Sequence, residues 1–256
     1  MTDANQIFSL QGKVALVTGA SKGIGEAIAR FFAACGATVV INSRKQEDLD
    51  QVAASIRDAG GNCVGMAANA GDLDACKELV TKVIAQFGGI DILVNNAATN
   101  PIYGPLLQAE EWAFDKIMNV NVKAPFELGK LVHHSMKSRG GGSIINISSI
   151  SGITPDPGLS LYSVSKAALN MLTKACAKEW GPDGIRVNAI CPGLIKTKFS
   201  EALWQNEQWL NRFVKMAPLS RMGTVDEIAG LALFLASPAS GYCTGTLFTA
   251  DGGVTI

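Results

Sequence analysis

Tyr162 and Lys166 form a pair whose residue types and spacing could do chemistry. They stand four positions apart in the stretch LYSVSK (161–166), which follows a loop rich in proline and glycine and begins an apolar helical segment. Positions i and i+4 lie on one face of an α-helix, so the phenol and the ammonium group would project side by side. A neighbouring cation lowers the pKa of a phenol, which is about 10 when unperturbed. The spacing predicts an acid–base pair, although by itself it is more typical of an ordinary helix surface.

A glycine-rich stretch, TGASKGIG (18–25), could bind phosphate. It connects the apolar run at 14–17 to a helical pattern at 26–32. Glycines allow a tight turn and a close approach of the backbone to a pyrophosphate, and the start of the following helix supplies N–H donors and partial positive charge. The spacing differs from the common G-x-G-x-x-G, and it is not that of a P-loop, which ends in Gly-Lys-Ser/Thr. The strand–turn–helix context nevertheless favours a dinucleotide-binding turn over a plain structural turn.

The end of the next apolar run predicts which dinucleotide binds. An NAD site needs an acidic residue here to accept both ribose hydroxyls, and that carboxylate would repel a 2′-phosphate. The sequence is VINSR (40–44), without an acid. Arg44 can bind a phosphate with its planar guanidinium, Ser43 can add a hydroxyl, and Lys22 of the glycine-rich stretch can approach from the other side. Two cations and a missing acid predict NADP(H); the alternative is that both are solvated surface charges.

The order of apolar runs along the chain predicts the scaffold that positions these groups. Short apolar runs alternate with helix-length segments, which indicates right-handed crossovers and a parallel sheet covered by helices on both faces. We predict an α/β fold of the Rossmann type, with a doubly wound, seven-stranded parallel sheet in one domain over residues 1–256. The expected strands are at 14–17, 38–41, 63–66, 90–94, 143–147, 185–190 and 246–249. The expected helices are at 23–35, 46–59, 73–87, 110–138, 161–180 and 225–236. Residues 193–224, with a short helix near 200–214, are expected to form a lid.

The composition argues against several classes of protein. Lysine and arginine (22) balance aspartate and glutamate (22), so no long-range field draws the chain to nucleic acid or to an anionic membrane. The longest apolar run, at 228–236, is too short to cross a bilayer, and no secretory signal is expected. Two histidines, and six cysteines without CxxC spacing, favour buried free thiols and no metal site. We expect a cytoplasmic protein without nucleic-acid or membrane partners.

Several motifs, in order along the chain, resemble those of the short-chain dehydrogenase/reductase family over residues 10–253. They are TGASKGIG (18–25), NNAA (95–98), Asn121, Ser149, Tyr162-x-x-x-Lys166 and PGLIKT (192–197). Two positions depart from the family pattern, since Ala98 stands where glycine is usual and Ala250 where valine is commoner. The resemblance implies a single-domain oxidoreductase that uses a nicotinamide cofactor.

The resemblance implies catalytic roles for four residues. Tyr162 would act as the general acid, giving its proton to a carbonyl oxygen as hydride arrives from the nicotinamide. Lys166 would lower the pKa of that tyrosine and hold the nicotinamide ribose. Ser149 would hydrogen-bond and orient the carbonyl, and Asn121 would hold a water that links Lys166 to solvent.

Two of these assignments have a neighbouring alternative, and the cofactor residues follow from the same resemblance. Ser148 could replace Ser149 and Asn119 could replace Asn121, but spacing to the other motifs favours Ser149 and Asn121. The pair at 69–70 would bracket the adenine, the pair at 96–97 the ribose, and the segment at 192–197 the nicotinamide carboxamide. With the phosphate-binding residues, the predicted NADP(H)-binding set is Gly19, Ser21, Lys22, Gly23, Ile24, Gly25, Ser43, Arg44, Asn69, Ala70, Asn96, Ala97, Tyr162, Lys166, Pro192, Gly193, Ile195 and Thr197.

The residues expected around the substrate are mostly apolar. They are Pro101, Ile102, Tyr103, Ile153, Pro155, Leu159, Leu194, Phe199, Leu203 and Trp204. Without a cluster of basic residues to bind a carboxylate or phosphate, this wall favours an uncharged ketone, aldehyde or secondary alcohol, and it resembles that of the family's broad-specificity carbonyl reductases. The nearest rival is a 3-oxoacyl-[acyl-carrier-protein] reductase, which needs a basic surface for an acidic carrier. Lys137 and Arg139 could contribute to it, but Asp183 stands where a second basic residue is expected.

Two further expectations concern activity and assembly. A non-catalytic NADP(H)-binding sensor on the same fold would usually lack the tyrosine, lysine or serine, and all three are present. The helical segments at 110–138 and 161–180 carry long apolar surfaces, and the family pairs the equivalent helices between subunits. Together with the apolar end of the stretch at 241–256, they predict a homotetramer built from two isologous contacts.

Overall fold

Seven parallel strands form one sheet, in the order β3-β2-β1-β4-β5-β6-β7. The computed structural model describes residues 4–256. Its strands are β1 (Val14–Thr18), β2 (Thr38–Ser43), β3 (Asn62–Ala67), β4 (Ile92–Asn95), β5 (Gly142–Ile147), β6 (Ile185–Pro192) and β7 (Leu247–Ala250). The chain runs outward from β1 to β3, crosses back to β4, and runs outward again to β7, as in doubly wound sheets. The predicted fold class is confirmed, and all the strands end at the same edge of the sheet.

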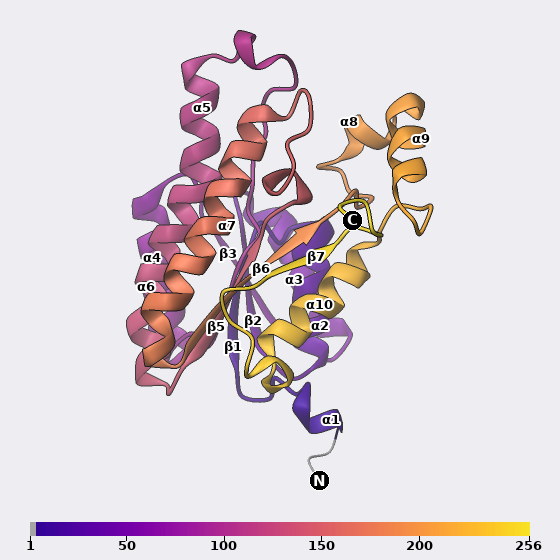
Figure 1. Cartoon of the computed structure of the whole chain (residues 1–256). Coiled ribbons are helices and arrows are strands. Elements are labelled where there is room, and N and C mark those ends of the chain that lie inside the picture. The colour runs from indigo at the N-terminus through magenta and orange to yellow at the C-terminus, as the bar shows by residue number, and fades with distance from the viewer. Residues whose placement is uncertain (1–3) are drawn as a thin grey trace.

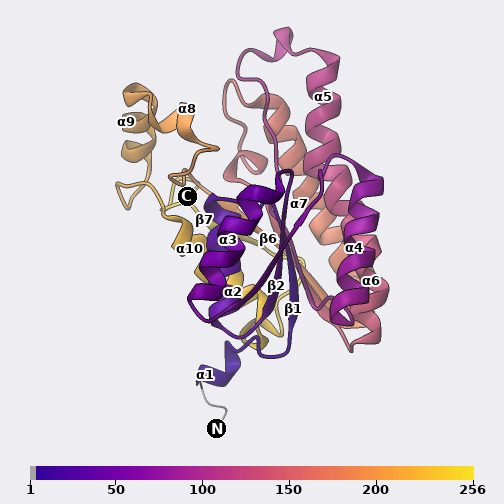
Figure 2. The same ribbon diagram turned by 180° about the vertical axis from the view of Figure 1, so that it is seen from behind.

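Helices cover both faces of the sheet, as the opposite views of Figures 1 and 2 show. One face carries α2 (Gly23–Ala34), α3 (Gln46–Asp58) and α10 (Val225–Ala236). The other carries α4 (Leu73–Phe87), α6 (Ala124–Ser138) and α7 (Ser160–Trp180). A short helix, α1 (Ala4–Ile7), precedes β1. Within residues 4–256, no helix combines the length and the apolar character that crossing a bilayer requires.

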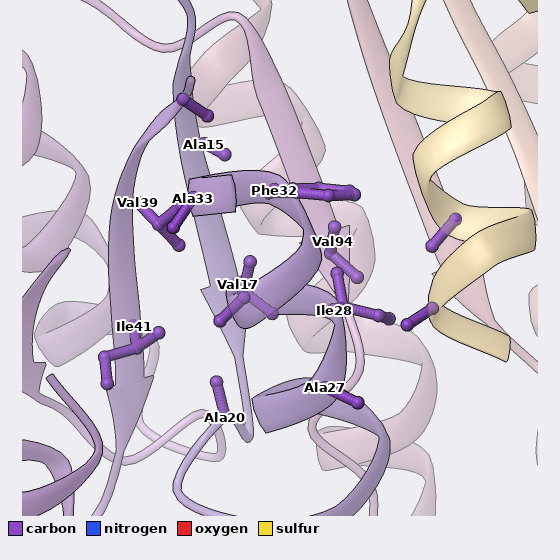
Figure 3. Packing of buried hydrophobic residues seen from close by; sticks show 14 of the residues in the cluster. Ala15, Val17, Ala20, Ala27, Ile28, Phe32, Ala33, Val39, Ile41 and Val94 are labelled. Carbon is purple, nitrogen blue, oxygen red and sulfur yellow. The ribbon is translucent and has the colours of Figure 1, made fainter. Parts of the chain in front are cut away.

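The hydrophobic core is divided into two clusters, one on each face of the sheet. Successive side chains of a strand point to opposite faces, so Ala15 and Val17 of β1 join one cluster while Leu16 joins the other. Figure 3 shows the first cluster, in which Ile28 and Phe32 of α2 pack on β1. Because β1 is buried along its whole length, the turn that follows it starts from a fixed point.

The predicted helix at 110–138 is interrupted in its middle. It consists of α5 (Glu111–Met118), a π-helical turn (Asn119–Lys123) and α6. Asn121 lies in this turn and is only 1% exposed; its Oδ1 accepts the N–H of Thr99 at 2.8 Å, and its Nδ2 donates to the carbonyl of Thr99 at 3.0 Å. The extra residue of a π-turn lets this amide reach the loop after β4, a contact that hydrophobic periodicity does not reveal.

The predicted lid contains two helices instead of one. They are α8 (Glu201–Trp204) and α9 (Glu207–Met216), and Asn206 begins the second by accepting the N–H groups of Gln208 and Trp209. A parallel bridge between Ile195 and Gly223 closes the base of this excursion. The bridge is held by hydrogen bonds from the N–H of Gly223 to the carbonyl of Leu194 (3.0 Å) and from the N–H of Lys196 to the carbonyl of Gly223 (3.3 Å). The chain therefore leaves the sheet and returns to it at one point.

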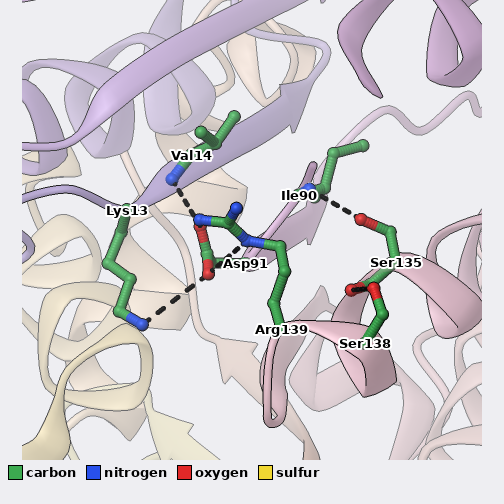
Figure 4. Close-up of polar contacts among 7 residues, drawn as sticks. All are labelled: Lys13, Val14, Ile90, Asp91, Ser135, Ser138 and Arg139. Carbon is green, nitrogen blue, oxygen red and sulfur yellow. Dashed lines mark hydrogen bonds and ion pairs between the residues drawn. The ribbon is translucent and has the colours of Figure 1, made fainter. Parts of the chain in front are cut away.

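A polar cluster holds the amino ends of β1 and β4, at the edge of the sheet opposite the lid (Figure 4). Asp91, only 3% exposed, accepts the N–H of Val14 at 2.8 Å and two hydrogen bonds from Arg139, at 2.9 and 2.8 Å. The ammonium of Lys13 lies 3.6 Å from the same carboxylate. Ser135 Oγ accepts the N–H of Ile90 at 3.0 Å, which fastens the end of α6 to the same corner. A buried carboxylate with this many partners is a structural anchor.

The cysteines are free thiols, most of them inside the two clusters. All six are unpaired, and four of them are buried. Burial raises the pKa of three thiols to about 11, those of Cys63, Cys76 and Cys176. These thiols therefore stay protonated at neutral pH and behave as small apolar side chains.

Candidate active site

A cavity of about 960 Å³ lies at the carboxyl ends of the strands and is lined by the segments that follow β1 to β6. This is the edge at which open α/β sheets bind ligands. Every predicted catalytic and cofactor-binding residue lines it except Gly25 and Asn121. The structure thus brings together residues from six separate segments of the chain.

The glycine-rich turn has the shape that a pyrophosphate requires. Gly19 and Gly23 have φ angles of 65° and 64°, which residues with a Cβ rarely adopt. Helix α2 starts at Gly23, and the Lys22 side chain makes no capping hydrogen bond there, so the first N–H groups of the helix are available to a phosphate. Gly25 serves packing instead: a Cβ there would lie 2.5 Å from Nδ2 of Asn96 and 2.7 Å from the carbonyl oxygen of Gly19. The turn therefore fits a dinucleotide phosphate.

Thr18 and Asn96 lock the turn to the loop after β4. Asn96 Nδ2 donates to the carbonyls of Thr18 and Gly19, both at 2.9 Å. Thr18 Oγ1 accepts the N–H groups of Asn96 and Ala97, both at 3.1 Å. These four hydrogen bonds fix the two loops against each other, so the predicted phosphate-side and ribose-side residues form one rigid wall.

The end of β2 presents positive charge to the cavity. Ser43 ends the strand, and Arg44 and Lys22 line the cavity with exposed side chains. The preceding residue, Asn42, is buried and donates to the carbonyls of Met66 and Ala68, so it is part of the sheet. Asp48 of α3 also lines this end of the cavity. Asp48 lies in α3, beyond the end of β2. The ribose-binding carboxylate of an NAD site is expected at the end of the strand itself.

Ser149, Tyr162 and Lys166 meet at the inner end of the cavity. Lys166 is only 2% exposed, and its ammonium donates to the carbonyl of Ile147 at 2.8 Å and lies 5.5 Å from the centre of the Tyr162 ring. Ser149 Oγ accepts the N–H of Ser151 at 3.1 Å. A hydroxyl that accepts at this lone pair keeps its own proton free to donate to a substrate oxygen.

The prediction that Lys166 lowers the pKa of Tyr162 is wrong for this structure. Burial raises the pKa of the Tyr162 phenol above its ordinary value, and contact with Ser149 acts in the opposite direction. Burial also lowers the pKa of the Lys166 ammonium to about 8. The ammonium is directed to the carbonyl of Ile147 and not to the phenol. Tyr162 is therefore protonated at neutral pH, which is the form that a general acid needs for carbonyl reduction.

Asn121 lies behind the cavity wall and not in it. Its Nδ2 donates to Ser165 Oγ at 3.0 Å as well as to the loop after β4, and Ser165 Oγ donates to the carbonyl of Tyr162 at 2.7 Å. This chain connects the π-turn to the first turn of α7, so the side chain of Asn121 positions the helix that carries Tyr162. The alternative residue, Asn119, lines the cavity and donates to the carbonyl of Gly71 at 2.7 Å, beside the predicted adenine pair.

Ser148, the alternative to Ser149, is buried, and its Oγ donates to the carbonyl of Lys166 at 3.3 Å. The hydroxyl proton of Ser148 is therefore used in a hydrogen bond within the protein, although Ser148 also borders the cavity. The geometry favours Ser149 as the residue that contacts a substrate oxygen.

Half of the residues predicted to surround the substrate line the cavity. Five of its members line the cavity: Tyr103, Leu159, Leu194, Phe199 and Leu203. Five do not: Pro101, Ile102, Ile153, Pro155 and Trp204. The indole of Trp204 donates to the carbonyl of Thr197 at 2.9 Å and so holds the base of the lid.

Sequence reasoning missed Asp156, Trp209 and Phe213, which also line the cavity. The apolar face of α9 was the available signal for Trp209 and Phe213.

Comparison with known proteins identifies the family of the chain. A family model described as enoyl-(acyl carrier protein) reductase matches residues 19–255. The protein named dehydrogenase/reductase SDR family member 4 from Homo sapiens is 43% identical over 244 residues, which are 95% of this chain and 88% of that protein. A crystal structure of a gluconate 5-dehydrogenase from Burkholderia cenocepacia in complex with NADP and tartrate has a TM-score of 0.95 at 35% identity, covering 99% of each chain. A 7α-hydroxysteroid dehydrogenase complexed with NADH and 7-oxo glycochenodeoxycholic acid has a TM-score of 0.94 at 32% identity, covering 99% of this chain and 98% of that one.

The doubly wound sheet, the phosphate-binding turn and the Ser–Tyr–Lys group in one cavity define an oxidoreductase that uses NAD(P) and acts on carbonyl or alcohol substrates. The chain belongs to the short-chain dehydrogenase/reductase family. The resemblance inferred from its motifs is confirmed.

Proposed function

We propose that this protein reduces an uncharged ketone or aldehyde to an alcohol, or catalyses the reverse reaction, with NADP(H) as cofactor. The observation that carries this proposal is the meeting of Ser149, a protonated Tyr162 and Lys166 in the same cavity as the phosphate-binding turn. The relatives named dehydrogenase/reductase SDR family member 4 support the reaction type.

The residues of the chain divide the reaction between them. The Ser149 hydroxyl, oriented by the N–H of Ser151, would donate a hydrogen bond to the substrate carbonyl oxygen. Tyr162 would give its proton to that oxygen as the alcohol forms. Lys166, whose ammonium is fixed on the carbonyl of Ile147, would hold the nicotinamide ribose. The bound nicotinamide supplies the hydride in reduction and accepts it in oxidation.

NADP(H) is favoured over NAD(H) by the charges at the end of β2. Arg44 and Lys22 line the cavity there, and the strand itself ends in Ser43 instead of a carboxylate that would repel a 2′-phosphate; the nearest lining carboxylate, Asp48, comes later in the chain, in α3. Arg44 can bind the phosphate oxygens with two parallel N–H groups, and Ser43 can add one hydroxyl. Solved relatives include one with NADP and one with NADH, so the choice depends on these residues.

The rival function, reduction of a 3-oxoacyl group on an acyl carrier protein, needs free basic residues on the surface. Lys137 pairs with Asp183 at 2.7 Å, and Arg139 is bound to Asp91 by two hydrogen bonds. Both cations are therefore neutralised within the chain, which argues against them as a landing site. The presence of Ser149, Tyr162 and Lys166 together argues against a non-catalytic sensor.

A homotetramer remains part of the proposal. The helices α5, α6 and α7 expose large apolar side chains: Trp112, Phe114, Phe126, Val164 and Met171. Tyr242 and Ile256, near and at the end of the chain, are fully exposed and suit a second contact. Two isologous contacts of this kind give D₂ symmetry. Light scattering at micromolar concentration should give four times the monomer mass, and a monomer would contradict the proposal.

The experiment that tests the function is NADPH oxidation with a panel of apolar ketones, diketones and β-ketoesters. Turnover with at least one class is expected. Tyr162→Phe deletes one hydroxyl and keeps the ring, so it should lose about 10²–10⁴-fold in kcat while still binding NADPH. Thr81→Val also deletes one hydroxyl, on the exposed side of α4 and away from the cavity lining, and should have no effect. Near-normal turnover by Tyr162→Phe would refute the assignment.

A further inference from the structure

Three residues that the reaction does not use form a rim around the substrate side of the cavity. Tyr103 comes from the loop after β4, Asp156 from the loop between β5 and α7, and Trp209 from α9 of the lid. We call these three residues the rim. Each side chain lines the cavity. Their chemistry is two aromatic rings and one carboxylate.

The aromatic half of the rim is held in place by packing. The rings of Tyr103 and Trp209 lie edge to face, with their centres 6.1 Å apart and their planes at 81°. On its other side Tyr103 covers Gly158, where a Cβ would lie 3.0 Å from Cζ of the tyrosine. A hydrogen bond of 3.1 Å from the N–H of Gly104 to the carbonyl of Gly158 joins the two loops. Tyr103 therefore contacts both of the other segments of the rim, while half of its surface (51%) stays exposed.

The acidic half of the rim is fixed close to the reacting centre. One oxygen of Asp156, Oδ2, accepts the hydroxyl of Ser151 at 2.8 Å. The backbone N–H of Ser151 in turn donates to Ser149 Oγ. The carboxylate is therefore two hydrogen bonds away from the serine that contacts the substrate oxygen. Burial and the charge of Asp156 both raise the pKa of the Tyr103 phenol, which agrees with their closeness.

The other charged residues that line the cavity are six cations and one carboxylate, and one of the cations, Lys198, belongs to the lid. Lys22, Arg44, Lys45 and Asp48 lie at the 2′-phosphate end, and Lys166 is buried under Tyr162. Lys116, on α5, stands one helical turn before Val120, which packs against Gly71 of the predicted adenine loop. Lys198 lies on the lid with an exposed side chain. Of the two carboxylates among the described lining residues, Asp48 lies at the 2′-phosphate end and Asp156 lies on the substrate side.

We propose that the rim gives the enzyme a preference for carbonyl compounds that carry a protonated amine over compounds that carry a carboxylate. A cation is attracted both by a carboxylate and by the faces of aromatic rings, whereas an anion is repelled by the carboxylate. The inference rests on the proposed function, since it names the substrate class that the same site favours.

The test uses three acetophenones with a cationic, a neutral and an anionic para substituent: para-(aminomethyl)acetophenone, the methyl ester of para-acetylbenzoate, and para-acetylbenzoate. With NADPH at low ionic strength, kcat/KM should fall in that order. The cation and the anion should differ by about a hundredfold, because attraction and repulsion near a partly buried carboxylate each account for about tenfold. Raising the ionic strength should narrow the difference.

Asp156→Asn keeps the shape of the side chain and removes its charge. It should shrink the difference between cation and anion by about tenfold or more and make it insensitive to salt. Glu207→Gln makes the same chemical change on α9 outside the cavity lining and should leave the difference intact. Ser151→Ala removes the hydrogen bond to Asp156. It keeps the charge of Asp156 and the backbone N–H of residue 151 that orients Ser149, so the order of kcat/KM among the three compounds should persist.

Two outcomes would overturn the inference. One is an Asp156→Asn variant, shown to bind NADPH normally, that keeps the wild-type difference between the three compounds. The other is a Ser151→Ala variant that loses the difference as completely as Asp156→Asn, since the effect would then come from loop geometry and not from charge. If the wild type reduces none of the three compounds nor any ketone of the panel, the proposed function itself fails, which is a separate result.

Discussion

Replacing Arg44 by alanine should reduce the preference for NADPH over NADH by about tenfold or more. Arg44 lines the cavity directly after β2, and Lys22 approaches the same place from the glycine-rich turn. A hydrogen bond to a charged group contributes roughly 1.5–3 kcal/mol, and each 1.4 kcal/mol is tenfold. Because both side chains are exposed, we take the lower end of that range for each. Two such cations give a wild-type preference of about two orders of magnitude, and Arg44→Ala removes one of them.

The assay is kcat/KM for each cofactor, measured with one good ketone at a saturating concentration. NADH serves as an internal control, because it lacks the 2′-phosphate and its kcat/KM should hardly change in Arg44→Ala. Lys82→Ala removes a cation that pairs with Glu78 on α4, away from the cavity lining, and should leave both cofactors unaffected. Ser43→Asp places a carboxylate at the end of β2 and should invert the preference. The reasoning is refuted if the wild type favours NADH, or if Arg44→Ala leaves the ratio unchanged.

Three other perturbations test the site and its scaffold. Ser149→Ala should lose most of the turnover and Ser148→Ala little, as measured by steady-state kinetics; the opposite order would mean that the wrong serine was assigned. Gly25→Ala would force a Cβ into Asn96 and Gly19, so it should lower the free energy of unfolding by about 1–3 kcal/mol or more and weaken NADPH binding. Gly230→Ala, on the exposed side of α10 with open space around it, should raise the free energy of unfolding by roughly 0.5–1 kcal/mol. Urea titrations of the two variants and the wild type measure these changes. The three buried thiols with a pKa of about 11 ionise near pH 9 when unfolded, so their contribution to stability is full below pH 9 and is lost as the pH rises towards 11. Urea midpoints that do not fall over this range would contradict the burial of these thiols.

The sheet was predictable from the sequence because its five central strands are buried on both faces. A strand such as β1 reads as a continuous apolar run, and its carboxyl end is marked by the first glycine of the turn. The phosphate-binding turn and the Tyr–Lys pair were found because their chemistry depends on local spacing. The glycine angles and the helix start then took the form that those spacings require.

The features of the site that could not be predicted from the sequence depend on contacts between distant segments of the chain. The helical pattern around Asn121 continues through the π-turn, and only the loop at Thr99 shows why an extra residue is inserted there. The pKa of Tyr162 depends on how deeply α7 is buried and on where the ammonium of Lys166 points, and neither can be read from a spacing of four residues. Asp156, between two prolines, reads as an ordinary loop acid until the fold brings it to the cavity.

The bridge between Ile195 and Gly223 brings the two ends of the lid together. Residues 198–222 leave and return near this pair, but the N–H of Leu219 also donates to the carbonyl of Gly252 at 3.2 Å, and Thr197 of the predicted carboxamide-binding segment lies on the lid side of the bridge. The entropy of closing a loop grows slowly, with about 0.6 kcal/mol for each doubling of its length. Lids of different length between residues 198 and 216 could therefore be exchanged between relatives, provided that Thr197 and the contacts of residues 217–219 with Gly252 and Gly253 are kept. For protein engineering, this means that substrate scope can be varied in a library of lids on a constant nucleotide site.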